Sequence, residues 1–140
     1  MHARPSARIS RPASRWTRPL GESEEARVGE HMERARAYLD EKKPSEAAIE
    51  YKNALQLAPN DAKAHFGLAE AYLANKEAQK AFWEFQETVR LDGANLDARL
   101  ALGQFLLLGQ EAEFEQAREQ GEAVIAADPN RREGYVLRAA

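Results

Sequence analysis

The chain has 140 residues, no cysteine and a formal net charge of −3, from 20 basic and 23 acidic side chains. This length allows one domain with a core of its own. The lack of cysteine excludes disulfide bonds, thiolate catalysis and cysteine–zinc sites. No run approaches the roughly 18 apolar residues of a membrane-spanning helix, so we expect no membrane span.

The charge is divided unevenly along the chain. Residues 1–20 contain five arginines and no acidic residue, which leaves 15 basic and 23 acidic residues in 21–140, a net charge of −8. Nucleic acid needs a basic surface opposite its phosphates, so this acidic body disfavours a nucleic-acid partner.

Residues 1–22 differ in composition from the rest and contain prolines seven residues apart, at Pro5, Pro12 and Pro19. Each proline removes a backbone donor and biases the residue before it toward extended geometry. The stretch has too few apolar residues to fold alone, so we expect a disordered Arg/Pro-rich tail. Its Arg- and Ser-rich composition resembles a transit peptide, but the three prolines disfavour the amphipathic helix that such peptides need. A basic arm that binds phosphate or lipid is the alternative. No secretory signal is visible, so the compartment stays open: cytoplasmic by default, periplasmic or envelope-associated if the native N-terminus differs.

Residues 23–140 form the predicted folded domain, and their main feature is a repeat. Segments 28–61 and 62–95 align without a gap at a period of 34 residues. The matched pairs are His31 with His65, Ala35 with Ala69, Tyr38 with Tyr72, Ala47 with Ala81, Tyr51 with Phe85, and Leu57 with Leu91. A fixed period of this length indicates a solenoid, in which each repeat buries its apolar face on its neighbours.

Each repeat is predicted to contain two helices. Proline or glycine clusters interrupt the helical pattern around residues 43–45, 58–60 and 92–95, and Ser23, Ser45 and Asn60 are candidate N-caps. The third repeat, 96–130, carries two extra residues, which we expect the turn at 109–114 to absorb. Residues 131–140 begin a fourth first helix. The sequence therefore predicts an all-α fold of seven helices, stacked as three hairpins plus one.

Several degenerate motifs occur in the same phase within these repeats. They read "HFGLAEAY" with "AFWEF", "ARAY" with "AAIEYKNALQLAP", and "RLALGQFL". Residues 24–140 thereby resemble the tetratricopeptide repeat (TPR) family, which implies a right-handed α-solenoid of antiparallel helix hairpins and a protein-interaction scaffold. The phrase "AAIEYKNALQLAPND" resembles, less specifically, bacterial repeat proteins of secretion and the cell envelope. That second resemblance implies a role within a larger bacterial assembly.

Small residues stand where the two helices of each hairpin should cross, so that the backbones can approach. These are Ala35, Ala69 and Gly103 on the first helices and Ala47, Ala81 and Ala117 on the second. Two residues depart from the family pattern. Arg34 replaces a buried leucine, which is tolerable if that face is partly open or if the aliphatic stem packs while the charged head stays in water. Gly121 replaces a large aromatic and is expected to loosen the third repeat.

No catalytic constellation or cofactor motif is visible, so we expect neither an enzyme nor a cofactor. His31 and His65 occupy equivalent sites and could share a metal. No cluster of acidic or histidine residues completes a ligand set, so packing at the motif's aromatic site is the favoured interpretation, with no metal. Phe82 and Trp83 are candidates for an exposed partner-binding anchor, although packing between helices is again favoured.

The resemblance implies a concave groove lined by the first helices, which holds a peptide or an amphipathic helix. The residues carried to it are Met32, Arg36, Leu39, Phe66, Glu70, Leu73, Leu100, Gln104 and Leu107. They form six apolar positions around a polar column, with Phe66 and Leu100 as expected central anchors. Alternatively, this stripe packs on further repeats or on a second copy of the chain, so self-association stays open.

One subclass of the family grips the C-terminal carboxylate of a peptide with lysine, asparagine and arginine on the first helices. The residues at those sites here are Met32, Arg36, Gly67, Asp97 and Ala101. The basic clamp is absent, so the resemblance disfavours chaperone C-terminal tails as ligands.

Overall fold

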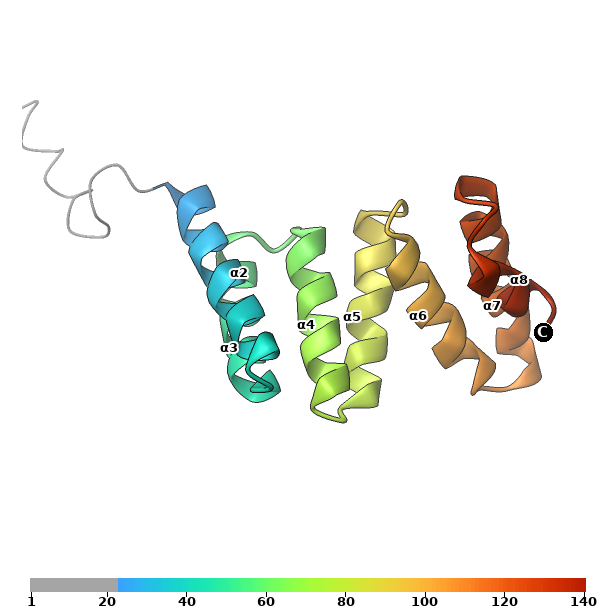
Figure 1. The fold of residues 1–140 in the computed structure, drawn as a ribbon, viewed down its shortest axis with the longest axis horizontal. Coiled ribbons are helices and arrows are strands. Elements are labelled where there is room, and N and C mark those ends of the chain that lie inside the picture. Colours follow the sequence, from blue (N-terminus) through green and yellow to red (C-terminus); the bar gives the residue numbers. More distant parts are fainter. Residues whose placement is uncertain (1–22) are drawn as a thin grey trace, which may run out of the picture.

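The computed structural model describes residues 23–140, except for the side chain of Ala112. The expected tail at 1–22 lies outside this part of the chain. The described residues form seven α-helices and no strand, which confirms the all-α prediction (Figure 1). The helices are α2 (Glu24–Asp40), α3 (Pro44–Leu57), α4 (Ala62–Ala74), α5 (Ala78–Leu91), α6 (Leu96–Leu107), α7 (Glu111–Ala127) and α8 (Arg132–Arg138).

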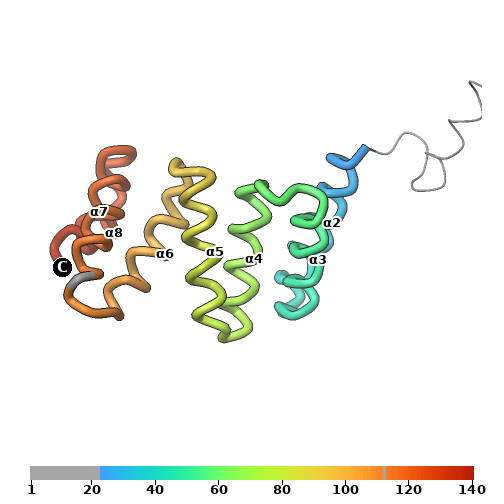
Figure 2. Tube along the Cα trace, turned by 180° about the vertical axis from the view of Figure 1, so that it is seen from behind, coloured from blue at the N-terminus to red at the C-terminus, as the bar shows by residue number. Residues whose placement is uncertain are grey.

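The helices pair in chain order into three hairpins that stand side by side as a solenoid (Figures 1 and 2). Hairpin 1 is α2 with α3, hairpin 2 is α4 with α5, and hairpin 3 is α6 with α7. The short α8 packs on α7 and α6 and takes the place of a fourth first helix. We call α2, α4 and α6 the first helices.

The first helices begin on side-chain caps that satisfy free backbone N–H groups. The side chain of Ser23 accepts from the amide of Ala26 at 3.1 Å, as expected. The carboxylate of Asp61, rather than Asn60, caps α4 by accepting from Lys63 at 2.9 Å and from the next amide at 3.1 Å. Ser45 does not cap α3, because that helix begins one residue earlier at Pro44.

Hairpins 1 and 2 turn in the same way. Lys42 and Lys76 adopt φ values of 62° and 64°, in the left-handed region that favours glycine. The amides of Lys43 and Glu77, one residue further on, donate back to the carbonyls of residues 38 and 72 at 2.8 Å. The repeated geometry at lysine, which tolerates this φ poorly, indicates that packing of the hairpin imposes it.

Hairpin 3 does not absorb its two extra residues in the turn, and that expectation is wrong. Its turn spans three residues, 108–110, as the turns at 41–43 and 75–77 do. Instead α7 has 17 residues, against 14 in α3 and α5, and the extension lies before Ala117. The backbone amide of Gln110 donates to the carboxylate of Glu113 at 3.1 Å, which stabilises this added helical turn.

The core of each hairpin is built on the small residues that the sequence pattern places at the crossings. Ala35, Ala47, Ala69, Ala81 and Ala117 are all fully buried. Short side chains at these points let the helix backbones approach each other, and the larger aromatics then fill the space between hairpins.

Gly121 does not loosen the third hairpin, contrary to expectation. A Cβ atom at Gly121 would lie 2.6 Å from the carbonyl oxygen of Gly134, so only glycine allows α8 to approach α7 this closely. Leu137 of α8 is buried against Gly103. The terminal helix therefore occupies the space that the missing aromatic would have filled. Arg34, on the outer edge of α2, keeps half of its side chain in solvent, 3.4 Å from Glu50.

Tyr51 fills the boundary between hairpins 1 and 2. Its side chain is fully buried against Gly67, where a Cβ atom would clash with the phenol ring. Its hydroxyl has no hydrogen-bond partner among the described residues, and burial raises the pKa of Tyr51. The equivalent residue one repeat later is Phe85, which has the same shape without the hydroxyl.

We predict that Tyr51→Phe raises the free energy of unfolding by about 1 kcal/mol, because it removes an unpaired buried hydroxyl. Urea unfolding followed by circular dichroism measures this. The reciprocal change Phe85→Tyr, which adds a hydroxyl at the equivalent site, is expected to lower stability. A loss of stability in Tyr51→Phe would show that the hydroxyl contributes a favourable interaction.

Candidate interaction site on the first helices

The nine predicted groove residues lie on the three first helices, and we call the surface they share the first-helix face. Three are exposed, five are half-buried and one is buried. The exposed residues are Arg36, Leu73 and Gln104, and the half-buried ones are Met32, Leu39, Phe66, Glu70 and Leu107. The sequence pattern alone does not separate these classes.

Leu100 is the buried residue, and its assignment as an accessible anchor is corrected. Only 6% of it is exposed, and it packs in one cluster with Val124 of α7 and Leu137 of α8. The terminal helix covers this position. Phe66 is also partly a core residue, because its ring contacts that of Phe85 edge-on at 5.9 Å between centroids.

A small cavity opens between α4 and α6 on the first-helix face. Its volume is about 160 Å³. Leu73 and Gln104, both predicted, line it together with Ala101, Phe105 and Leu108, which were not predicted as groove residues. Leu108 is 84% exposed and Leu73 is 47% exposed. The cavity lies below the usual range of about 300–1,000 Å³ for small-molecule pockets. It is better suited to one apolar side chain of a larger partner.

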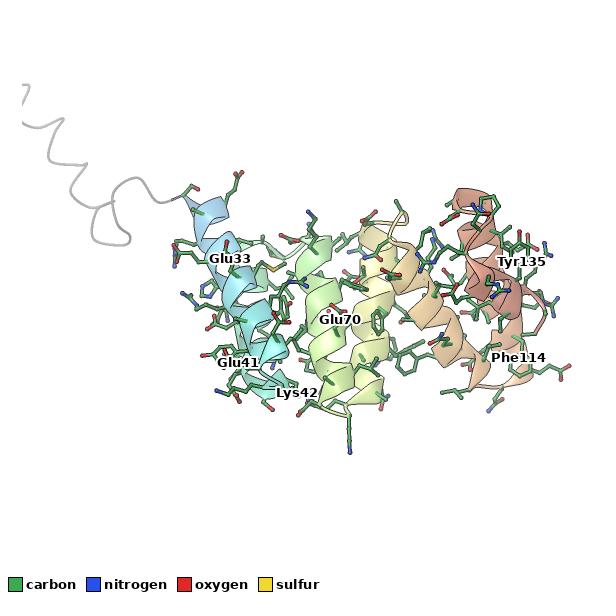
Figure 3. The ribbon with its side chains drawn as sticks, viewed as in Figure 1. Glu33, Glu41, Lys42, Glu70, Phe114 and Tyr135 are labelled. Atoms are coloured by element: carbon green, nitrogen blue, oxygen red, sulfur yellow. The ribbon has the colours of Figure 1, made fainter. Side chains whose placement is uncertain are left out.

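Glu70 stands at the middle of α4 (Figure 3). Burial raises the pKa of this half-buried carboxyl, Arg36 on α2 partly offsets the rise, and Asp97 on α6 adds to it. No described residue forms a hydrogen bond or ion pair with the Glu70 carboxylate. Glu70 is therefore a partly desolvated acid whose negative charge has no directly bonded partner within residues 23–140.

A larger cleft of about 610 Å³ opens between α5 and the end of α6. The ribbon and the Cα tube both show α6 running away from α5 toward this end (Figures 1 and 2). The rings of Phe82 and Phe105 meet edge-on in this cleft, with their centroids 5.9 Å apart. The equivalent residues at the boundary between hairpins 1 and 2 are Ala48 and Ala71. The two aromatic rings hold the hairpins apart. Phe82 thus packs between helices, as favoured, whereas Trp83 is 58% exposed.

His31 and His65 do not approach a shared site; each bonds within its own hairpin. Their Nδ1 atoms lie 2.7 Å from Glu50 and 2.6 Å from Glu84, respectively. Residues 23–140 contain no group of three or more side chains able to hold a metal ion. The histidines link the two helices of a hairpin.

Hairpin 3 carries the same link with different residues. The guanidinium of Arg99 donates to the side chain of Gln120 at 2.8 Å, and it also donates to the carbonyl of Gly93 at 2.7 Å. His65 likewise reaches back to the carbonyl of Pro59, at 2.8 Å from Nε2. Each of these side chains therefore joins the turn before its helix to the second helix of its own hairpin.

Comparison with known proteins agrees with this architecture. Residues 38–82 match the tetratricopeptide repeat family. Hairpins 1 to 3 reproduce the helix pairs of solved TPR domains over about four-fifths of the chain.

Hairpins 1 to 3 therefore have the tetratricopeptide-repeat fold.

Three solved TPR domains illustrate the likeness. The first TPR domain of Spaghetti (RPAP3), bound to the HSP90 peptide SRMEEVD, is 20% identical with a TM-score of 0.67, covering 81% of this chain and 90% of that one. The second TPR domain of human RPAP3, in complex with the HSP70 peptide SGPTIEEVD, is 18% identical with a TM-score of 0.69, covering 84% and 96%. The Arabidopsis OM64 TPR domain is 18% identical with a TM-score of 0.70, covering 84% and 95%. No curated protein sequence matches the chain significantly.

The TPR pattern places the first helices correctly but does not reveal Phe105 and Leu108. The signal that was available is the run Leu106, Leu107 and Leu108 at the end of α6. The third leucine, Leu108, is equivalent to Asp40 and Ala74 of the other two repeats. A large apolar side chain therefore stands at a position where the other repeats have a charged or a small one.

No described helix has the length and apolar character needed to cross a membrane.

We predict opposite pH-dependent effects for two glutamates of this TPR domain. The folded-state pKa of Glu70 is raised, so its carboxylate destabilises the fold above that pKa and has no effect below its ordinary value of 4.5. Glu70→Gln should therefore raise the melting temperature at pH 7, and the difference should vanish in acid.

Glu50 is the matched control with the opposite sign. The hydrogen bond from His31 lowers the pKa of Glu50, with a further contribution from Arg34, and outweighs the effect of burial. Its stabilisation is present above pH 4.5 and is lost as the pH falls through the lowered folded value. Glu50→Gln should lower the melting temperature at pH 7. Equal shifts in the two variants would contradict the assigned environments.

Proposed function

We propose that this protein is a non-catalytic interaction scaffold whose first-helix face binds a peptide or an amphipathic helix. The observation that carries the proposal is the cavity between α4 and α6, rimmed by the exposed Leu73 and Leu108. Large apolar side chains exposed beside a cavity are typical of sites that bind a partner. The peptide complexes of the two RPAP3 domains support peptide binding as a use of this fold.

The apolar part of the proposed site lies nearer the turn end of hairpins 2 and 3 than the sequence pattern placed it. Leu73 and Gln104 belong to it, whereas Leu100 belongs to the core. Leu39, Met32 and Phe66 extend the surface toward hairpin 1 as half-buried residues. An amphipathic helix fits such a surface because its apolar face can cover several residues at once. A place in a larger bacterial assembly rests on the sequence resemblance alone.

We predict that Leu73→Ala and Leu108→Ala each weaken binding of an amphipathic helical peptide about tenfold, because central apolar contacts dominate such interfaces. The peptide carries leucines three and four residues apart, and fluorescence anisotropy of a labelled version reports the affinity. Both residues are exposed, so circular dichroism should stay unchanged. Trp83→Ala is the control, because Trp83 lies outside the first-helix face. Binding that depends on Trp83 but not on the leucines would contradict the proposal.

A self-associating module is the second candidate, and α8 is the observation that favours it. This helix stands in a first-helix position with Val136 66% exposed and Tyr135 39% exposed. No second helix covers it within the described residues. A second copy of the chain could bury these side chains.

Light scattering over a concentration series separates the two candidates. A scaffold for another partner should stay monomeric at micromolar concentration. A self-associating module should gain mass as concentration rises, and Val136→Ser should reduce that gain. Self-association that persists in Val136→Ser would exclude α8 as the contact surface.

A further inference from the structure

Glu70 and the cavity lie next to each other on the first-helix face. Glu70 precedes Leu73 by three residues on α4, so the carboxylate and the cavity wall share one side of the helix, about one turn apart. Neighbouring side chains of one bound peptide can reach both. The lining of the cavity contains the neutral Gln104 and no basic residue.

The charges around Glu70 are unequal on its two sides. Arg36 on α2 lowers the pKa of Glu70, whereas Asp97 in the first turn of α6 raises it. Asp97 is already bound to Arg131 at 2.6 Å. Glu70 has no such ion pair with any described residue. A cation arriving at Glu70 would therefore meet an acid that has no ion pair with residues 23–140.

We propose, on the basis of the proposed function, that the first-helix face selects a cationic amphipathic segment. A lysine or arginine of the partner pairs with Glu70, and an adjacent apolar side chain enters the cavity lined by Leu73, Phe105 and Leu108. The charge of this proposed partner is opposite to that of the acidic peptides SRMEEVD and SGPTIEEVD, which are bound by the two RPAP3 domains.

The physical reason is electrostatic. Glu70 is partly removed from water by the fold itself, so part of the desolvation that an ion pair requires has already taken place. A basic side chain gains attraction there, whereas an acidic one would bring like charges together in a partly buried site. The described residues carry 15 basic and 22 acidic side chains, so long-range attraction acts in the same direction.

The experiment uses the full chain and three labelled probes followed by fluorescence anisotropy. The cationic probe is an amphipathic helical peptide of leucine and lysine, the anionic probe has glutamate at every lysine, and the third is SRMEEVD. We expect the cationic probe to bind at least about tenfold more tightly than the other two. Raising the salt concentration should reduce this preference.

Variants assign the preference to one residue. Glu70→Gln should weaken the cationic probe about tenfold, since one charge-assisted pair is lost, and Glu70→Lys should favour the anionic probe. Glu119→Gln is the matched control, because it removes one exposed acid from α7. An equal loss in Glu119→Gln would mean attraction by net charge only and would overturn the proposal.

The remaining outcomes separate this proposal from the proposed function. If both leucine-rich probes bind equally and Leu73→Ala weakens both, the face binds apolar segments without charge selection, and only the present inference fails. If Leu73→Ala and Leu108→Ala change the binding of no probe, the proposed function fails as well. If the chain dimerises and the cationic probe competes with dimer formation, a second copy occupies the face and the inference is overturned.

Discussion

The close approach of helix backbones at small residues is the constraint on which the rest of the structure depends. Ala35 with Ala47, and Ala69 with Ala81, are fully buried at equivalent crossings one repeat apart. A larger side chain at any crossing would push the two helices of a hairpin apart. Because neighbouring hairpins pack against each other, that displacement would pass to the aromatic side chains between them.

The candidate site arises where this regular packing changes. At the boundary of hairpins 1 and 2, Ala48 and Ala71 allow close contact, whereas Phe82 and Phe105 separate hairpins 2 and 3. The separation exposes Leu108 and leaves apolar space on both sides of Phe105. The bulk of two side chains thus converts a structural boundary into the surface that we propose receives a partner. A local departure from a consistent pattern is often where function resides.

The sequence determined the repeat period, the crossing residues and the seven helices, because these depend on spacing within 34 residues. It could not determine how deeply each groove residue is buried, because burial depends on the next hairpin. Leu100 became a core residue because Val124 of α7 and Leu137 of α8 pack against it. The space around Gly121 is filled for the same reason, because α8 packs directly against this residue. Glu70 can be recognised as a candidate binding residue only once its half-burial and its lack of an ion pair within residues 23–140 are known.

The polar links explain how hairpins of different sequence keep the same geometry. His65 and Arg99 each join the turn before their helix to the second helix of their own hairpin. The ring of His65 presents two nitrogens to two oxygens, and the guanidinium of Arg99 presents several N–H donors in a fixed fork. The same connection therefore rests on an imidazole in hairpin 2 and on a guanidinium in hairpin 3. Between these two links lies the boundary that Phe82 and Phe105 hold open, so each side of the candidate site is anchored by a different chemistry.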